Sequence, residues 1–188
     1  MLRFLAVLAA FLLLAVPQAT ATEAGWALLR EGGQIVLLVH ANAPGVGDPA
    51  HFDIDNCRTQ RNLSDRGRQQ ARRIGALFAA RAEPVGQVYS SRYCRAMETA
   101  RLAFGERLVE PLEALDSIAR DPDGEAAHEA TAAVVALARD YSDSGNLVLV
   151  THPENVAALT GARAREGEAV IVTPHGDGLA VIGRIVFN

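Results

Sequence analysis

The sequence predicts a three-layer α/β/α sandwich, in which helices cover both faces of a mostly parallel β-sheet. Two continuous apolar runs, at residues 34–39 and 146–150, are typical of strands that are buried on both faces of such a sheet. Between them, segments with helical apolar spacing alternate with further short strand-like runs, which favours parallel pairing. The length of 188 residues and the apolar fraction of 49% suit one domain with one core.

The first 21 residues predict a secretory signal peptide. Arg3 precedes an apolar run at residues 4–16, and Ala19-Thr20-Ala21 fits the A-x-A cleavage pattern. The run is shorter than the about 20 residues of a membrane span, although an uncleaved anchor is the alternative interpretation. We therefore expect a mature domain at residues 22–188, periplasmic or secreted, with no membrane attachment after cleavage.

The remaining elements follow from periodicity and from turn residues. Residues 41–62 contain several Gly and Pro and predict a long loop. Ser64 can cap the next helix, whose apolar residues recur at helical spacing. Further strands are expected at 85–90, 108–109, 146–150, 169–172 and 179–186, and further helices at 95–104, 125–141 and 154–159.

Two histidines and two arginines follow predicted strands. His40 and His152 come directly after the two buried runs, and Arg92 and Arg95 follow the strand at 85–90. Because ligands bind beyond the carboxyl ends of parallel strands, these side chains can converge on one pocket. A neutral imidazole can attack phosphorus, and guanidinium groups bind phosphate oxygens. The pattern therefore predicts phosphoryl transfer.

The expected partner is a small phosphorylated substrate or a phosphate anion. The formal net charge of −4 argues against a general nucleic-acid binder, which needs a broad basic face. We expect no cofactor, because histidine-based phosphoryl transfer requires none, and no residue spacing indicates a metal site. Nothing in the sequence predicts the oligomeric state.

Four blocks of sequence resemble motifs of one known family, in the family's order. Residues 36–41 resemble its first strand with an Arg-His-Gly/Ala motif, and residues 60–71 resemble Arg-x-Leu-Thr/Ser-x-x-Gly-x-x-Gln-Ala. Residues 90–100 resemble Ser-x-x-x-Arg-Ala-x-x-Thr-Ala, and residues 147–152 resemble a late strand that ends in Thr-His. The family is the histidine phosphatase superfamily, also called phosphoglycerate mutase-like, and the resemblance implies that fold and a phosphatase activity.

Site roles follow from this resemblance position by position. It implies that His40 is the phosphate-accepting nucleophile, that Arg95 clamps the phosphate and that His152 is the second histidine of the pocket. Glu154, in His152-Pro153-Glu154, resembles the proton-donating acid of a His-x-Glu variant; the alternative is a first-turn carboxylate that is favoured by the helix dipole. The candidate substrate-binding residues are Arg61, Arg92 and Asn42.

Val39 departs from the family pattern, because the residue before the nucleophile is normally Arg. The loss of one preorganised donor can cost about 10²–10³ in rate. Two explanations stay open. The chain is a degenerate relative with weak or no turnover, or another guanidinium, from Arg61, Arg58 or Arg92, fills the position.

Cys57 and Cys94 form an even pair in a chain that is expected to be exported, which favours a disulfide over two buried thiols. The bond would contribute about 3–4 kcal/mol and would tie the long loop to the segment that carries Arg95. The leading functional hypothesis is a periplasmic phosphomonoester hydrolase acting through phospho-His40. The alternatives are a catalytically inactive phosphate- or ligand-binding relative and a structural envelope protein.

Overall fold

The computed structural model describes residues 18–81 and 84–187. Most of the predicted signal peptide, residues 1–17, lies outside the described residues. The helices are α2 (Gln18–Arg30), α3 (Asp65–Arg81), α4 (Cys94–Phe104), α5 (Glu125–Asp140) and α6 (Pro153–Thr160), with short 3₁₀ turns η1 (Cys57–Thr59), η2 (Glu106–Leu108) and η3 (Glu113–Leu115). The strands are β1 (Ile35–Val39), β2 (Val85–Ser90), β3 (Val109–Pro111), β4 (Asn146–Thr151), β5 (Glu168–His175) and β6 (Gly178–Val186).

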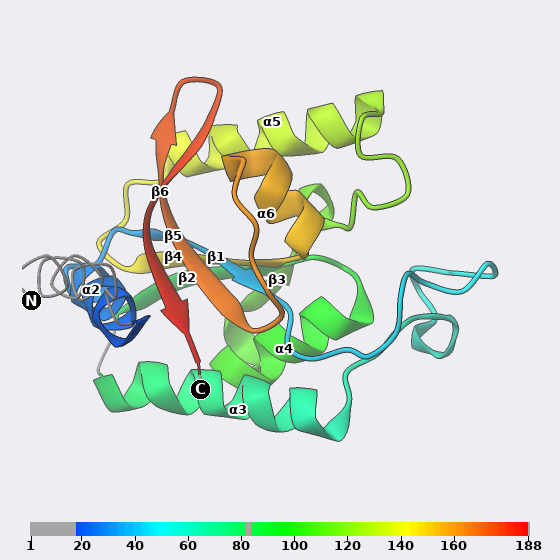
Figure 1. Ribbon diagram of the computed structural model, residues 1–188, viewed down its shortest axis with the longest axis horizontal. Helices are drawn as coiled ribbons and strands as arrows, with labels where there is room; N and C mark the ends of the chain where they lie inside the picture. The colour runs from blue at the N-terminus through cyan, green and yellow to red at the C-terminus, as the bar shows by residue number, and fades with distance from the viewer. Residues whose placement is uncertain (1–17, 82–83, 188) are drawn as a thin grey trace, which may run out of the picture.

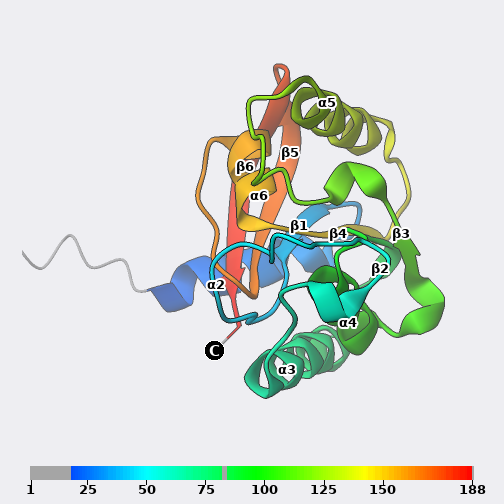
Figure 2. The ribbon, with the colours of Figure 1, turned by 90° about the vertical axis from the view of Figure 1, so that its right-hand side faces the viewer.

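The strands form one six-stranded sheet in the order β3-β2-β4-β1-β5-β6. The first four of these are parallel, whereas β5 and β6 are antiparallel to their neighbours. Helices α5 and α6 cover one face, and α2, α3 and α4 cover the other (Figures 1 and 2). The predicted three-layer sandwich is confirmed, with an antiparallel pair at one edge of the mostly parallel sheet.

Strand β1 shows why its run is apolar throughout. Ile35, Leu37 and Val39 pack in the cluster beneath α5 and α6, whereas Val36 and Leu38 pack in the cluster with α3 and α4. All five residues are buried because helices cover both faces. The central position of this strand places the residue that follows it in the middle of the sheet's carboxyl edge.

Strand register aligns the ends of three strands. Val39 of β1 is paired with Thr151 of β4, and Ser90 of β2 is paired with Val150. The residues that follow these strands therefore emerge side by side at the carboxyl edge. This alignment is the geometric expectation from the sequence, and it positions the candidate site.

The start of α3 is fixed to the chain after β1. The Ser64 hydroxyl accepts a hydrogen bond from the Gly67 N–H at 3.0 Å, so the predicted cap is confirmed. A Cβ on Gly67 would lie 2.1 Å from the carbonyl oxygen of Asn42. Glycine is needed here because the helix and the loop backbone approach too closely for a side chain.

Two differences from the expected elements have physical causes. Strands β5 and β6 extend beyond the predicted ranges into an exposed hairpin, where backbone pairing needs no apolar pattern. Helix α2 was not predicted, and it runs through the expected cleavage position after Ala21. Trp26 of α2 is buried against Phe78 and Phe187, so this helix belongs to the core.

No helix among the described residues is long and apolar enough to span a membrane.

Candidate functional site

His40 follows β1 and is fully buried. Its Nδ1 lies 2.9 Å from the carbonyl oxygen of Ala41. Because a carbonyl oxygen only accepts, the proton resides on Nδ1, and Nε2 keeps its lone pair. The Nε–H of Arg95 donates to this Nε2 at 3.3 Å. The ring is therefore held with its Nε2 unprotonated and directed at a guanidinium, and an unprotonated nitrogen is what a nucleophilic imidazole requires.

Arg95 lies in the first turn of α4, and its side chain is only 2% exposed. Its Nη1 donates to both carboxylate oxygens of Asp48, at 3.0 and 3.1 Å. The guanidinium also lies over the ring of Tyr93, with Cζ 4.7 Å from the ring centroid. Burial lowers the pKa of Arg95, and the Asp48 carboxylate opposes that effect. The arginine that was expected to hold phosphate holds an internal carboxylate in this structure.

His152 follows β4, and its ring centroid lies 5.3 Å from that of His40. Its Nε2 is 2.8 Å from the Ser91 hydroxyl oxygen, and the Ser91 hydroxyl donates to Asp116 Oδ1 at 3.1 Å. Since the hydroxyl proton is directed to the carboxylate, Ser91 accepts from the Nε2–H of His152. The buried Nδ1 of His152 has no hydrogen-bond partner among the described residues. That nitrogen is available to a ligand.

Burial keeps both imidazoles neutral at neutral pH. It lowers the pKa of His40 to about 3, an effect that the hydrogen bond to Ala41 opposes. Burial also lowers the pKa of His152 well below its usual value. The positive charges of Arg95 and Arg61 lower both pKa values further. A neutral His40 is the form that can attack phosphorus.

Arg61 connects the long loop to a second acidic residue. Its Nη1 donates to the carbonyl oxygen of Ala43 at 2.6 Å and to Glu166 Oε1 at 3.3 Å. Its buried Nε has no partner among the described residues, so one donor remains available. Asn42 instead has both ends of its amide occupied: Nδ2 donates to Glu166 at 2.9 Å, and Oδ1 accepts from Ser64 at 2.7 Å.

The position of Val39 is apolar in the structure. Val39 is fully buried in the cluster beneath α5 and α6. Arg58 is exposed on η1, and Arg92 donates through Nε to Asp116 Oδ2 at 2.7 Å. Of the three arginines considered as replacements, Arg61 is the one whose charge acts on both imidazoles. The predicted roles of Arg61, Arg92 and Asn42 in substrate binding stay predictions.

Glu154 is the second residue of α6 and is partly buried. It accepts a hydrogen bond from the hydroxyl of Ser117. Its negative charge raises the pKa of Arg95, so the carboxylate interacts electrostatically with the site. The first-turn position also suits the helix dipole. The role of Glu154 as proton donor stays a prediction.

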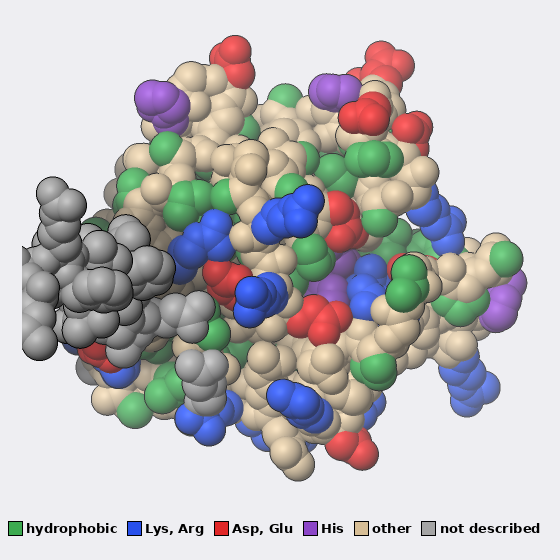
Figure 3. Space-filling view, viewed as in Figure 1, with side chains coloured by type: hydrophobic (Ala, Val, Ile, Leu, Met, Phe, Trp, Pro, Cys, Tyr) green, Lys and Arg blue, Asp and Glu red, His purple; other side chains and the backbone are tan. Residues whose placement is uncertain are grey.

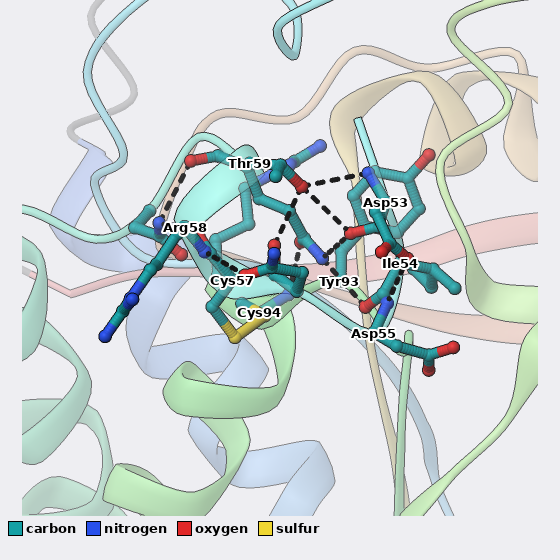
Figure 4. Close-up of a disulfide and its surroundings, with 12 residues drawn as sticks. Asp53, Ile54, Asp55, Cys57, Arg58, Thr59, Tyr93 and Cys94 are labelled. Carbon is teal, nitrogen blue, oxygen red and sulfur yellow. Dashed lines mark hydrogen bonds between the residues drawn. A yellow bond between two sulfur atoms is a disulfide. The ribbon is translucent and has the colours of Figure 1, made fainter. Parts of the chain in front are cut away.

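The predicted disulfide between Cys57 and Cys94 is present, with Cα atoms 5.7 Å apart (Figure 4). Cys57 begins η1, and Cys94 begins α4, the helix that carries Arg95. Gln60 links the same segments, because its Oε1 accepts from the Cys94 N–H at 2.9 Å and its Nε2 donates to the Asp53 carbonyl at 3.0 Å. The loop is thus anchored by a covalent bond and by hydrogen bonds.

Sequence reasoning missed several residues of this site. Asp48, Asp116 and Glu166 come from irregular segments, where no periodicity marks a side chain that turns inward. Ser91 stands in a block that the sequence did identify, at the serine of Ser-x-x-x-Arg, and that position was a usable signal. The described residues contain no group of three or more His, Cys, Asp and Glu that could hold a metal ion.

Comparisons with known proteins agree with the sequence blocks. A family model of the histidine phosphatase superfamily (branch 1) matches residues 51–119. No curated protein matches the sequence. Among solved structures, the protein histidine phosphatase SixA, complexed with tungstate, has a TM-score of 0.55 and 18% identity, covering 81% of this chain and 96% of that chain.

Two further solved structures have the same fold. A phosphoserine phosphatase variant from Entamoeba histolytica in complex with phosphoserine has a TM-score of 0.55 at 11% identity, covering 82% of this chain and 98% of that chain. The product of open reading frame Rv3214 from Mycobacterium tuberculosis has a TM-score of 0.59 at 18% identity, with the same coverage. The chain has the histidine phosphatase fold, and its resemblance to that superfamily is confirmed.

Proposed function

We propose that this chain is a phosphomonoester hydrolase that forms a phosphohistidine on His40. One observation carries the proposal: the neutral His40 presents an unprotonated Nε2 to Arg95, and the unpartnered Nδ1 of His152 lies in the same buried group of side chains. These groups provide the nucleophile and two phosphoryl-binding positions that the reaction requires.

In the first step, the Nε2 lone pair of His40 attacks phosphorus, and the bond from phosphorus to the leaving oxygen breaks. His152 takes up a proton on Nδ1 from solvent as the dianionic substrate binds, so that Arg95 and His152 both donate to the phosphoryl oxygens. Glu154 enters the step in its protonated form and gives that proton to the leaving alkoxide. In the second step, water attacks phosphorus and gives a proton to the Glu154 carboxylate. The P–N bond breaks, phosphate is released, and the Nε2 lone pair is restored.

The test is rapid-quench labelling with a phosphomonoester that carries radioactive phosphorus. Fresh wild-type protein should acquire an acid-labile, base-stable label, and His40→Ala should not. His51→Ala is the matched control, because His51 is exposed in the long loop and should keep full labelling. No label above background in wild-type protein would refute the proposal.

We also propose that the protein works in the periplasm or is secreted. The charged and apolar pattern of residues 1–21 supports export, and a disulfide is favoured in an oxidising compartment. N-terminal sequencing of the exported protein should begin at Thr22. A mature protein that still begins at Met1 would contradict the predicted cleavage.

A second candidate is a phosphate- or ligand-binding relative without turnover. Two observations favour it: Val39 is a buried apolar residue at the position where the family has a guanidinium, and Arg95 is paired with Asp48. This candidate predicts anion binding in calorimetry without phosphoenzyme or turnover. If Val39→Arg instead produces a large gain in turnover, the protein is an enzyme that is limited by the missing donor.

A further inference from the structure

The proposed reaction requires Arg95 to bind a phosphoryl group, but Arg95 is already paired with Asp48. Nη1 donates to both carboxylate oxygens, and Nε donates to His40. The side chains of the ion pair are 2% and 8% exposed, so solvent screens this contact little. An incoming anion therefore meets a guanidinium that already donates through two of its three nitrogens and is partly neutralised by the Asp48 carboxylate.

Asp48 reaches the site from the long loop between β1 and α3. Gly45 and Gly47 have φ values of 108° and 68°, which glycine adopts far more readily than other residues. They flank the exposed Val46 and reverse the chain, so that Asp48 returns to the site. There the backbone N–H of Arg61 donates to Asp48 Oδ1 at 2.9 Å, which holds the carboxylate in place.

The same loop closes over the imidazoles. Phe52 stacks on Tyr93 with ring centroids 4.9 Å apart, and Tyr93 contacts His152 edge to face, also at 4.9 Å. Both His40 and His152 are fully buried. Figure 3 shows a hollow in this face of the molecule where His and Arg side chains meet acidic ones. The imidazoles and the Arg95 guanidinium are thus buried and paired internally at the bottom of this hollow.

We propose that Asp48 determines the anion affinity and selectivity of this site, because its carboxylate is an internal ligand of Arg95 that a phosphoryl group has to displace. Like charges repel, so a bound dianion and the Asp48 carboxylate cannot share one buried guanidinium favourably. Doubly charged anions should compete with the carboxylate better than singly charged ones. The proposal rests on the proposed function only in placing the anion at Arg95.

The first experiment measures tungstate binding by isothermal titration calorimetry. Asp48→Asn should bind tungstate at least about tenfold more tightly than wild type, a typical size for coupling between two ligands. Asp48→Glu keeps the charge and should stay closer to the wild-type affinity than Asp48→Asn. Asp53→Asn is the matched control, because Asp53 is an exposed acid of the same loop whose contacts are local.

A second measurement uses wild-type protein, because Asp48→Asn leaves Arg95 as an unpaired buried charge and can fold poorly. Hydrogen exchange at the Arg61 amide reports on whether the Asp48 carboxylate stays in place, since this N–H donates to the same oxygen, Oδ1, that accepts from Arg95. Tungstate should accelerate exchange at this amide if the carboxylate leaves. Unchanged or slower exchange with tungstate bound would overturn the proposal.

The outcomes separate this inference from the proposed function. Equal or weaker tungstate binding by a folded Asp48→Asn variant would overturn the inference, even if wild-type protein still forms the phosphohistidine. Tighter binding by that variant, without any phosphohistidine in wild type, would support the inference and refute the enzymatic proposal. Absence of both tungstate binding and label would refute both.

Discussion

His152 Nε2 lies 2.8 Å from the hydroxyl oxygen of Ser91, and this contact determines which nitrogen of the ring stays free. Because Ser91 donates its own proton to Asp116, it accepts from Nε2–H, and Nδ1 is left with a lone pair. A neutral His152 cannot donate from Nδ1 to an anion. Protonation of Nδ1 would allow this.

Anion binding should therefore be coupled to proton uptake at His152. Its pKa is well below the usual value without ligand, and a nearby anion raises it. Sulfate stays doubly charged, so its affinity should be highest at low pH and should fall by up to about tenfold per pH unit as the pH rises above the lowered pKa of the unliganded His152. Calorimetry in buffers with different ionisation enthalpies measures both the sulfate affinity and the number of protons taken up on binding. An affinity that is independent of pH would contradict this coupling.

Ser91→Ala should weaken sulfate binding by about tenfold, because the change leaves the buried Nε2–H of His152 without its acceptor, whereas Asp116 keeps its contacts with Arg92. Ser91 acts here as a positioning residue for His152, so Ser91→Ala should also change how the sulfate affinity depends on pH. Ser91→Thr keeps a hydroxyl and should restore both the affinity and its pH dependence. Ser90→Ala is the matched control, because the Ser90 hydroxyl is equally buried but donates only to the Ser91 carbonyl at 3.0 Å. Wild-type affinity and pH profile in Ser91→Ala would argue against the role.

Acid should destabilise the fold through His40. The pKa of His40 is about 3 in the folded state and about 6.5 in the unfolded state, so the unfolded chain binds more protons between these values. The stabilisation is complete above about pH 6.5 and is lost as the pH falls towards about 3. When the pH falls from about 7.5 to about 5, the titration of His40 alone should lower the free energy of unfolding by about 2 kcal/mol.

Urea denaturation of His40→Asn measures this contribution, because asparagine does not titrate. The variant should lose about 2 kcal/mol less than wild type over the same pH interval. His51→Asn is the control, since His51 is exposed and should behave as wild type. Equal losses in wild type and His40→Asn would show that His40 is not buried in its neutral form.

Removal of the disulfide should destabilise the protein and loosen the long loop. The cysteines are 37 residues apart, and closure of a loop of this length is worth about 4 kcal/mol. Urea unfolding of the double variant Cys57→Ser and Cys94→Ser should show a loss of this order. Wild-type protein in the presence of a reductant is the matched comparison, and it should lose about as much unfolding free energy as the double variant. Unchanged stability in both samples would mean that the bond contributes little.

The sequence by itself determined the layers of the fold and which side chains meet at the carboxyl edge of the sheet. The apolar runs before His40 and His152 are short and typical of strands covered on both faces, and parallel strands bring their carboxyl ends to one edge. The pairing of Cys57 with Cys94 was also readable, because an exported chain with two cysteines favours a bond. These features depend on local pattern and on simple topology.

Only the tertiary structure decided what surrounds those residues. Asp48 pairs with Arg95 and Glu166 pairs with Arg61, and both acidic residues lie in loops. No periodicity or spacing in the sequence indicates where a loop turns back towards the site. The tautomers of the histidines depend on which oxygen lies beside each nitrogen, which requires positions rather than residue types. The contact between Arg95 and Asp48 is therefore a property of the folded loop, since its two members are 47 residues apart in the chain.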